Sequence, residues 1–326
     1  MSLFSLEDPS VDQILEAIDD EMASTRKQPK VLLFDIGGVC VSRLSALTSL
    51  SRSLTPVKVV SPFQAILDYE LSLGIPTGWI NFSISKSAPN GYWHRLERGE
   101  IPMDKGFFDG FNSDLHNASL WKEFYQREQS KNPKLPAGLP PLPALDGEWL
   151  FNEMMTKSHA TDPWMWPALQ NLKKSGKYIL GALSNTVIFP PGHNLHSADY
   201  FNDPIRLLFD VFISSAHVGV RKPDPKMYQL AVTTLDKFAR DNADSPRGKQ
   251  LGWADGVKPT DVLFFDDIGE NLRAAKAQGF NTFKVPLGRA YEAVEELENV
   301  TGLKLEGDHP KIPVKPRLTP PPKARI

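Results

Sequence analysis

The stretch Val31-Leu32-Leu33-Phe34-Asp35-Ile36-Gly37-Gly38-Val39 decides the fold that we expect for this chain. Its four apolar residues favour a β-strand, and the two glycines after Asp35 end that strand. A short apolar run bounded by glycines is typical of a buried central strand. Open α/β sheets bind ligands just beyond the carboxyl ends of such strands, so we expect Asp35 in the active crevice. Aspartates after strands are also common in turns and helix caps, so this assignment depends on later segments.

The composition is that of an ordinary globular protein. Of 326 residues, 41% are hydrophobic and 23% are charged, with a formal net charge of -2. This composition predicts no electrostatic binding of nucleic acid or membranes. Cys40 is the only cysteine, which excludes an internal disulfide and a thiolate zinc cluster. Without a secretory signal or a membrane-spanning run, a cytoplasmic location is expected, and residues 324–326 suggest a peroxisomal alternative.

Strands and helices alternate from residue 178 onward. Strands are predicted over 178–183, 209–214, 262–265 and 282–285, and helices begin near residues 225 and 269. This alternation predicts a parallel sheet covered by helices on both faces, which the strand 31–34 joins. The expected fold class is therefore α/β, with a Rossmann-like three-layer core around a parallel sheet.

The remaining residues divide the chain into further parts. Residues 43–176 predict aromatic-rich helices, which we expect to form a helical cap inserted between two strands of the sheet. Residues 30–42 and 177–305 would form the α/β core, and residues 1–29 a helical N-terminal extension. The proline-rich, basic residues 306–326 have too few apolar side chains to offset the entropy of ordering, so we expect disorder there.

Polar residues follow two further strands and precede one helix. Ser184 and Asn185 follow the second strand, and Lys222 lies just before a helix. Asp266-Asp267 follow the fourth strand, with Asn271 one helical turn later. Together these residue types suit phosphoryl transfer, because a phosphate dianion repels an attacking carboxylate and both must be neutralised. A magnesium ion held by oxygen ligands supplies part of the positive charge, and a lysine supplies the rest.

In this order, the four segments resemble those of the haloacid dehalogenase-like hydrolase superfamily over about residues 31–306. Within it, the sequence is most similar to the N-terminal phosphatase domain of soluble epoxide hydrolases and to the related domain of certain acyl-CoA dehydrogenases. The closer resemblance rests on residues 96–101 (LERGEI), 218–223 (VGVRKP) and 264–280 (FFDDIGENLRAAKAQGF). It implies a helical cap inserted after the first strand.

The resemblance also implies a metal site. Asp35 would be the nucleophile and a ligand of Mg²⁺. The backbone carbonyl of Gly37 and the side chain of Asp267 would bind the same ion.

Further roles follow from the same resemblance. Lys222 would be catalytic and stabilise both the nucleophile and the phosphoryl group. Ser184 and Asn185 would bind the phosphate of a small phosphorylated substrate. Asp266 and Asn271 would support the site without binding the ion directly.

Gly37 departs from the pattern of such phosphatases, which usually carry there a second aspartate that protonates the leaving group. General acid-base help of this kind contributes about 10²–10⁴-fold, so we expect a preference for good leaving groups such as sugar 1-phosphates or acyl phosphates. One alternative is a catalytically weak binding or regulatory protein. Another is a metal-free haloacid dehalogenase, against which the paired Asp266-Asp267 argue. The physiological substrate and the oligomeric state, a homodimer included, stay open.

Cap residues would select the substrate, although the same residue types are common in helix packing and on surfaces. The candidates are Trp79, Trp93, His94, Glu97, Arg98, Trp164 and Trp166. Epoxide hydrolysis is disfavoured, because the sequence has no Gly-x-Ser-x-Gly elbow.

Overall fold

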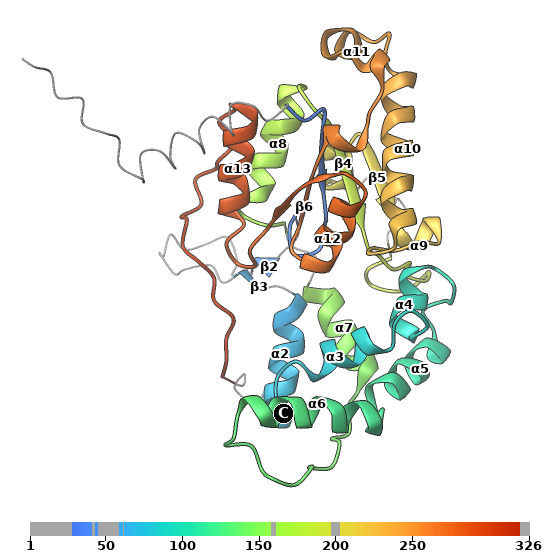
Figure 1. Cartoon of the computed structure of the whole chain (residues 1–326), viewed down its shortest axis with the longest axis vertical. Helices are drawn as coiled ribbons and strands as arrows, with labels where there is room; N and C mark the ends of the chain where they lie inside the picture. The colour runs from blue at the N-terminus through green and yellow to red at the C-terminus, as the bar shows by residue number, and fades with distance from the viewer. Residues whose placement is uncertain are drawn as a thin grey trace, which may run out of the picture.

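A five-stranded parallel sheet of order β5-β4-β1-β6-β7 lies at the centre of the computed structural model (Figure 1). The structure describes residues 28–40, 43–44, 59–60, 62–157, 161–196 and 203–319. The strands are β1 (Val31–Phe34), β4 (Ile179–Ser184), β5 (Val211–Ser214), β6 (Val262–Asp266) and β7 (Asn281–Lys284). Each lies within two residues of its predicted position, which confirms the predicted sheet.

Strand β1 is central because it pairs with β4 on one side and with β6 on the other. Its side chains alternate between two apolar clusters, as the period of a strand requires. Leu32 and Phe34 pack in a cluster with α8 (Met165–Ser175) and α13 (Tyr291–Thr301). Val31 and Leu33 pack on the opposite face in a cluster with α10 (Pro225–Asp241) and α12 (Gly269–Ala277). The predicted three-layer core is therefore confirmed (Figure 1).

Six of the described helices between β1 and β4 gather beyond one end of the sheet and have an aromatic core of their own (Figure 1). They are α2 (Pro62–Leu73), α3 (Trp79–Lys86), α4 (Tyr92–Glu97), α5 (Lys105–Leu115), α6 (Ala118–Lys131) and α7 (Gly147–Lys157). We call these helices the cap. Helix α8 falls within the predicted insertion of residues 43–176, but it packs on the sheet instead. The exact domain boundaries stay a prediction.

Smaller elements complete the described part of the chain. They are β2 (Arg43–Leu44) and β3 (Val59–Val60), which pair antiparallel, helices α9 (Ser215–Val218) and α11 (Pro246–Leu251), and the 3-10 helices η2 (Arg206–Leu208), η3 (Trp253–Asp255) and η4 (Pro259–Asp261). No helix in these ranges is long and apolar enough to span a membrane. The helix expected within residues 1–29 and the terminal residues 324–326 lie outside the described residues.

Residues 306–319 differ from the expected disorder, because they make specific contacts with the core and with the cap. The indole Nε1 of Trp164 donates to the carbonyl of Pro310 (3.0 Å), and the N–H of Val314 donates to the carbonyl of Gly288 (2.8 Å). Farther along, Arg317 forms an ion pair with the cap. The expectation of disorder rested on the small number of apolar residues in this segment. Hydrogen bonds of the backbone and a charged side chain hold it against the folded core and cap instead.

Candidate active site

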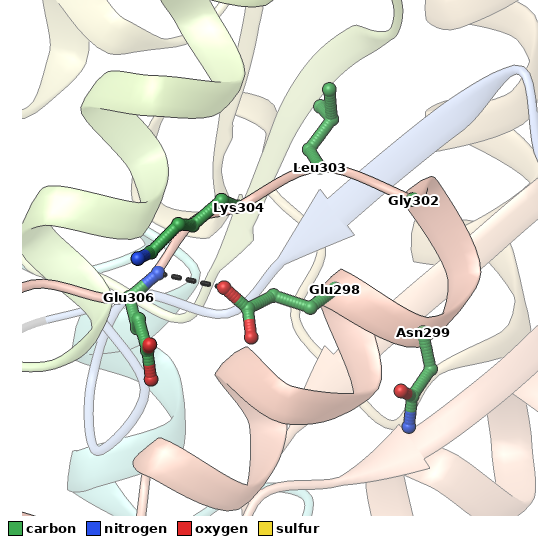
Figure 2. Close-up of a pocket in the computed structure, with 6 residues that line it drawn as sticks. All are labelled: Glu298, Asn299, Gly302, Leu303, Lys304 and Glu306. Carbon is green, nitrogen blue, oxygen red and sulfur yellow. Dashed lines mark hydrogen bonds between the residues drawn. The ribbon is translucent and has the colours of Figure 1, made fainter.

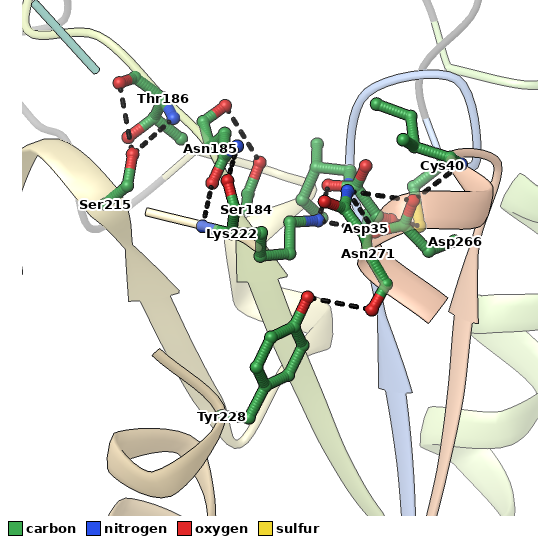
Figure 3. A network of polar contacts seen from close by, with 12 residues as sticks. Asp35, Cys40, Ser184, Asn185, Thr186, Ser215, Lys222, Tyr228, Asp266 and Asn271 are labelled. Carbon is green, nitrogen blue, oxygen red and sulfur yellow. Dashed lines mark hydrogen bonds and ion pairs between the residues drawn. The ribbon is translucent and has the colours of Figure 1, made fainter. Parts of the chain in front are cut away.

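The carboxyl ends of three neighbouring strands bring the predicted site residues together (Figure 3). Asp35 follows β1, Ser184 ends β4 and Asp266 ends β6. The strands run in register, with Phe34 opposite both Ala182 and Phe265. Because adjacent parallel strands end at the same edge of a sheet, polar residues distant in sequence meet there.

Lys222 is the charged centre of this edge. Its side chain is 1% exposed, and its Nζ lies 2.9 Å from Asp35 Oδ1 and 2.7 Å from Asp266 Oδ2. Burial works to lower the pKa of Lys222, but the charges of Asp266 and Asp35 outweigh it and raise that pKa above its ordinary value. The lysine is therefore a fixed positive charge beside the predicted nucleophile.

Asn185 fixes the backbone that carries this lysine. Its Oδ1 accepts the N–H of Lys222 (2.8 Å), and its Nδ2 donates to the carbonyl of the same residue (3.1 Å). The side chain thus acts as a two-sided clamp on Lys222. Its predicted role in phosphate binding stays a prediction.

Three carboxylates form an acidic cluster beside the lysine. One oxygen each from Asp35, Asp266 and Asp267 lies within 4.8 Å of the others. Burial raises the pKa of Asp35 to about 6, with Lys222 opposing and Asp266 adding to the rise. Burial, and then repulsion from Asp35 and Asp266, raises the pKa of Asp267 well above its ordinary range. A bound cation would remove this repulsion.

The acidic cluster has the oxygen ligands of a metal site, and one of its carboxylate oxygens lacks a hydrogen-bond partner among the described residues. Oδ1 of the buried Asp267 has no hydrogen-bond partner among the residues that the structure describes. A buried carboxylate oxygen without a partner is costly, and hard divalent cations prefer oxygen ligands of this kind. Asp35 and Asp267 therefore fit the metal that the sequence predicts.

Asp266 and Asn271 lie behind this pair. Asp266 is fully buried, and its carboxylate accepts from Lys222, from the N–H of Ile268 (2.8 Å) and from Asn271 Nδ2 (3.0 Å). The carbonyl of Asn271 in turn accepts the hydroxyl of Tyr228 (2.9 Å). Asn271 thus holds the Asp266 carboxylate that Lys222 contacts, and the supporting role of both residues stays a prediction.

The two glycines after Asp35 have different surroundings. Gly38 has φ of 76°, and a Cβ there would lie 2.5 Å from Asp267 Oδ2, so a side chain at this position would displace the carboxylate. A Cβ at Gly37 would meet no atom within 4 Å. The predicted metal contact of the Gly37 carbonyl stays a prediction.

The structure also shows a hydroxyl network that sequence reasoning missed (Figure 3). Ser184 is buried, and its Oγ is 3.5 Å from the carbonyl of Asn185. Beyond it, the N–H of Thr186 donates to Ser215 Oγ (2.9 Å), and the Thr186 hydroxyl contacts the Ser214 hydroxyl. Ser214 and Ser215, at the end of β5 and just after it, were the sequence feature that could have indicated this network. The role of Ser184 in phosphate binding stays a prediction.

Three of the proposed substrate-selecting residues have contacts that indicate what their side chains do. Trp79 is fully buried in the aromatic core of the cap, and Trp164 packs on the sheet side against residues 309–310, so both serve packing. Glu97 instead reaches across to the core, where its Oε2 lies 2.6 Å from Arg221 Nε.

A shallow hollow of about 460 Å³ lies at the end of α13, away from the acidic cluster (Figure 2). Its lining residues are Glu298, Asn299, Gly302, Leu303, Lys304 and Glu306. The Glu298 carboxylate already accepts the N–H groups of Leu305 and Glu306 (2.6 and 2.9 Å), so it closes the chain after α13. We assign no chemistry to this hollow.

The chain is similar to several known proteins. It is 25% identical to acyl-CoA dehydrogenase family member 10 of Mus musculus over 85% of this chain, and 32% identical to bifunctional epoxide hydrolase 2 of Mus musculus over 76%. It is 28% identical to phosphatase MT3486 of Mycobacterium tuberculosis over 44%. The matched segments are 19%, 37% and 55% of those proteins, so the chain spans less than two thirds of each relative's length.

These relatives agree with the resemblance carried by the sequence motifs. The family model of the haloacid dehalogenase-like hydrolases matches residues 29–279, which contain four of the five strands of the sheet, the cap and every residue of the acidic cluster. The chain therefore belongs to the haloacid dehalogenase-like hydrolase family.

Proposed function

We propose that this hydrolase is a magnesium-dependent phosphatase of small phosphate esters, with Asp35 as the nucleophile. The observation that carries the proposal is the pairing of Lys222 with Asp35 and Asp266 beside Asp267, whose Oδ1 has no hydrogen-bond partner among the described residues. This pairing offers a nucleophile, a fixed positive charge and an oxygen-lined place for a cation. The similarity to a phosphatase supports the same substrate class.

The first step would form an aspartyl-phosphate. The Asp35 carboxylate attacks phosphorus, the bond from phosphorus to the ester oxygen breaks, and the leaving alcohol takes its proton from water because Gly37 carries no acid. Lys222 and the N–H of Ile36, which donates to Asp35 Oδ1 (2.7 Å), hold the carboxylate in place. When bound by Asp35, Asp267 and the carbonyl of Gly37, a magnesium ion would neutralise charge on the phosphoryl group.

The second step would restore the enzyme. Water attacks phosphorus and gives up a proton to the solvent, the bond from phosphorus to Asp35 breaks, and inorganic phosphate leaves with the carboxylate regenerated. Lys222 would remain beside Asp35 and Asp266 in both steps, and its positive charge would stabilise the negative charge on the phosphoryl oxygens.

The test is hydrolysis of para-nitrophenyl phosphate by wild-type protein and by Asp35→Asn, with Mg²⁺ and with chelator. We expect metal-dependent turnover that falls at least about 10³-fold in the variant, because the nucleophile is removed. Asp109→Asn is a matched control, since Asp109 is an exposed cap residue paired with Lys105. Equal turnover by Asp35→Asn would refute the proposal.

A binding or regulatory role is the second candidate, and the absent acid at Gly37 favours it. It predicts that Mg²⁺ and inorganic phosphate bind, as measured by calorimetry, without turnover of any phosphate ester. The cytoplasmic location and the homodimer stay predictions, since no described contact bears on them.

A further inference from the structure

Two of the motifs that carry the family resemblance meet in space. Residues 96–101 span the end of helix α4 of the cap and the turn after it, and residues 218–223 run from the last residue of helix α9 of the core into the next loop. Glu97 Oε2 and Arg221 Nε lie 2.6 Å apart, and the two side chains are 10% and 20% exposed. A charged pair with so little exposure is screened weakly and depends on its geometry. The proposed phosphatase chemistry leaves this contact unexplained.

The contact lies where the backbone of the cap touches the backbone of the core. A Cβ at Gly99, whose φ is 65°, would lie 2.2 Å from the carbonyl oxygen of Ala216. No side chain fits between the two segments at this point, which explains the glycine. Glu97 ends α4, and Arg221 lies three residues after α9, so we expect a shift of α4 relative to α9 to change the distance between the two side chains.

Arg221 precedes Lys222 in the chain, so a single peptide bond links the residue that pairs with Glu97 to the proposed catalytic lysine. The backbone of Lys222 is clamped on one side by the amide of Asn185. The preceding residue is held by Glu97 of the cap. Lys222 Nζ must lie within hydrogen-bond distance of two carboxylates at once, so small changes in this backbone matter.

We propose that Glu97 is a positioning residue that couples the cap to the catalytic lysine. With the cap docked, Glu97 holds Arg221, and the loop presents Lys222 Nζ to Asp35 and Asp266. When the cap moves away, the ion pair breaks and the loop loses the support of Glu97. The proposal deepens the proposed function, because it rests on Lys222 acting on the phosphoryl group.

The first measurement does not require catalysis. Wild-type protein, Glu97→Gln and Glu100→Gln are treated briefly with acetic anhydride, and acetylation of Lys222 relative to the exposed Lys226 is read by peptide mass spectrometry. Lys222 is almost fully buried, so we expect slow labelling in the wild type and a several-fold increase in Glu97→Gln. Glu100→Gln is the matched control, since Glu100 lies in the same motif but pairs with Arg98 inside the cap.

The second measurement is turnover of para-nitrophenyl phosphate. We expect Glu97→Gln to lower kcat by about 10–100-fold with KM changed less than about threefold, because displaced catalytic groups affect the reaction more than binding. Arg221→Gln should act alike, and the double variant should be no worse than either single variant, since both remove one contact. Glu100→Gln should stay within about twofold of wild type.

The outcomes separate the two proposals. An inactive wild type would refute the phosphatase, and the labelling of Lys222 would still decide the coupling. Equal Lys222 labelling in folded Glu97→Gln and Glu100→Gln, or a loss confined to KM, would overturn the coupling. Additive losses in the double variant would overturn it as well, and thermal unfolding of each variant shows whether it folds.

Discussion

At the scale of single residues, Gly37 and Gly38 show how differently two neighbouring glycines serve one site. Gly38 is required by its positive φ and by the carboxylate of Asp267, which occupies the place of a side chain. Gly37 has open space in that direction, so neither backbone nor packing demands glycine there. Gly37 therefore affects the site by the acid group that it lacks, and a substitution at this position tests that directly.

We expect Gly37→Asp to raise the hydrolysis of phosphate esters with poor leaving groups by about 10–100-fold, as a general acid placed two residues after the nucleophile would do. The measurement compares kcat/KM for an alkyl phosphate and for para-nitrophenyl phosphate. The gain should be confined to the alkyl ester, whose leaving group needs the proton. Gly37→Asn is the control of equal shape without an acid. A folded Gly37→Asp protein with no gain over Gly37→Asn would contradict this explanation.

At the scale of an element, helix α4 carries a buried histidine next to the ion pair with the core. His94 is 4% exposed, and its Nδ1 has no hydrogen-bond partner among the described residues. Burial, and then the charges of Arg221 and Arg98, lower the pKa of His94 to about 4. The folded protein therefore holds a neutral imidazole at neutral pH.

This lowered pKa predicts a loss of stability in acid. Below its ordinary pKa of 6.5 the imidazole takes up a proton in the unfolded chain but stays neutral in the folded one. Acidification from pH 6.5 to 4 therefore stabilises the unfolded state, by roughly 1–3 kcal/mol. Urea unfolding at pH 7, 5.5 and 4.5 measures this, and His94→Leu should show a smaller loss. Parallel pH profiles for wild type and variant would show that His94 is not the cause.

Local sequence predicted the strands well because each is a short apolar run bounded by turn residues. The same reasoning placed Asp35, Ser184 and Asp266 at one edge, since strand ends of a parallel sheet share that edge. Side-chain contacts between distant segments could not be predicted this way. Glu97 and Arg221 are 124 positions apart, and neither residue type specifies its partner. Helix α13 was also missed, and its burial against the sheet depends on a few apolar residues among acidic ones.

At the scale of the whole molecule, residues 306–319 connect the core to the cap. Beyond the contacts of Pro310 and Val314 with the core, Arg317 meets helix α2 at three points. Its Nη2 lies 2.7 Å from Asp68 Oδ2, its N–H donates to Gln64 Oε1 (2.9 Å), and its carbonyl accepts from Gln64 Nε2 (3.0 Å). A segment fixed at both ends in this way restrains movement of α2 relative to the sheet.

Arg317→Ala should therefore loosen the cap while leaving the core unchanged. The substitution removes the ion pair with Asp68 but keeps the backbone contacts with Gln64. Because Arg317 is 41% exposed, we expect the free energy of local opening of α2 to fall by only about 0.5–1 kcal/mol. Hydrogen exchange read by mass spectrometry should then show peptides of α2 exchanging about two- to fivefold faster and peptides of α10 unchanged. Arg127→Ala is the control, because it removes a partly exposed arginine that belongs to the cap itself. Equal acceleration in α2 and α10 would mean a general loss of stability, and unchanged exchange in α2 would mean that the segment does not restrain the cap.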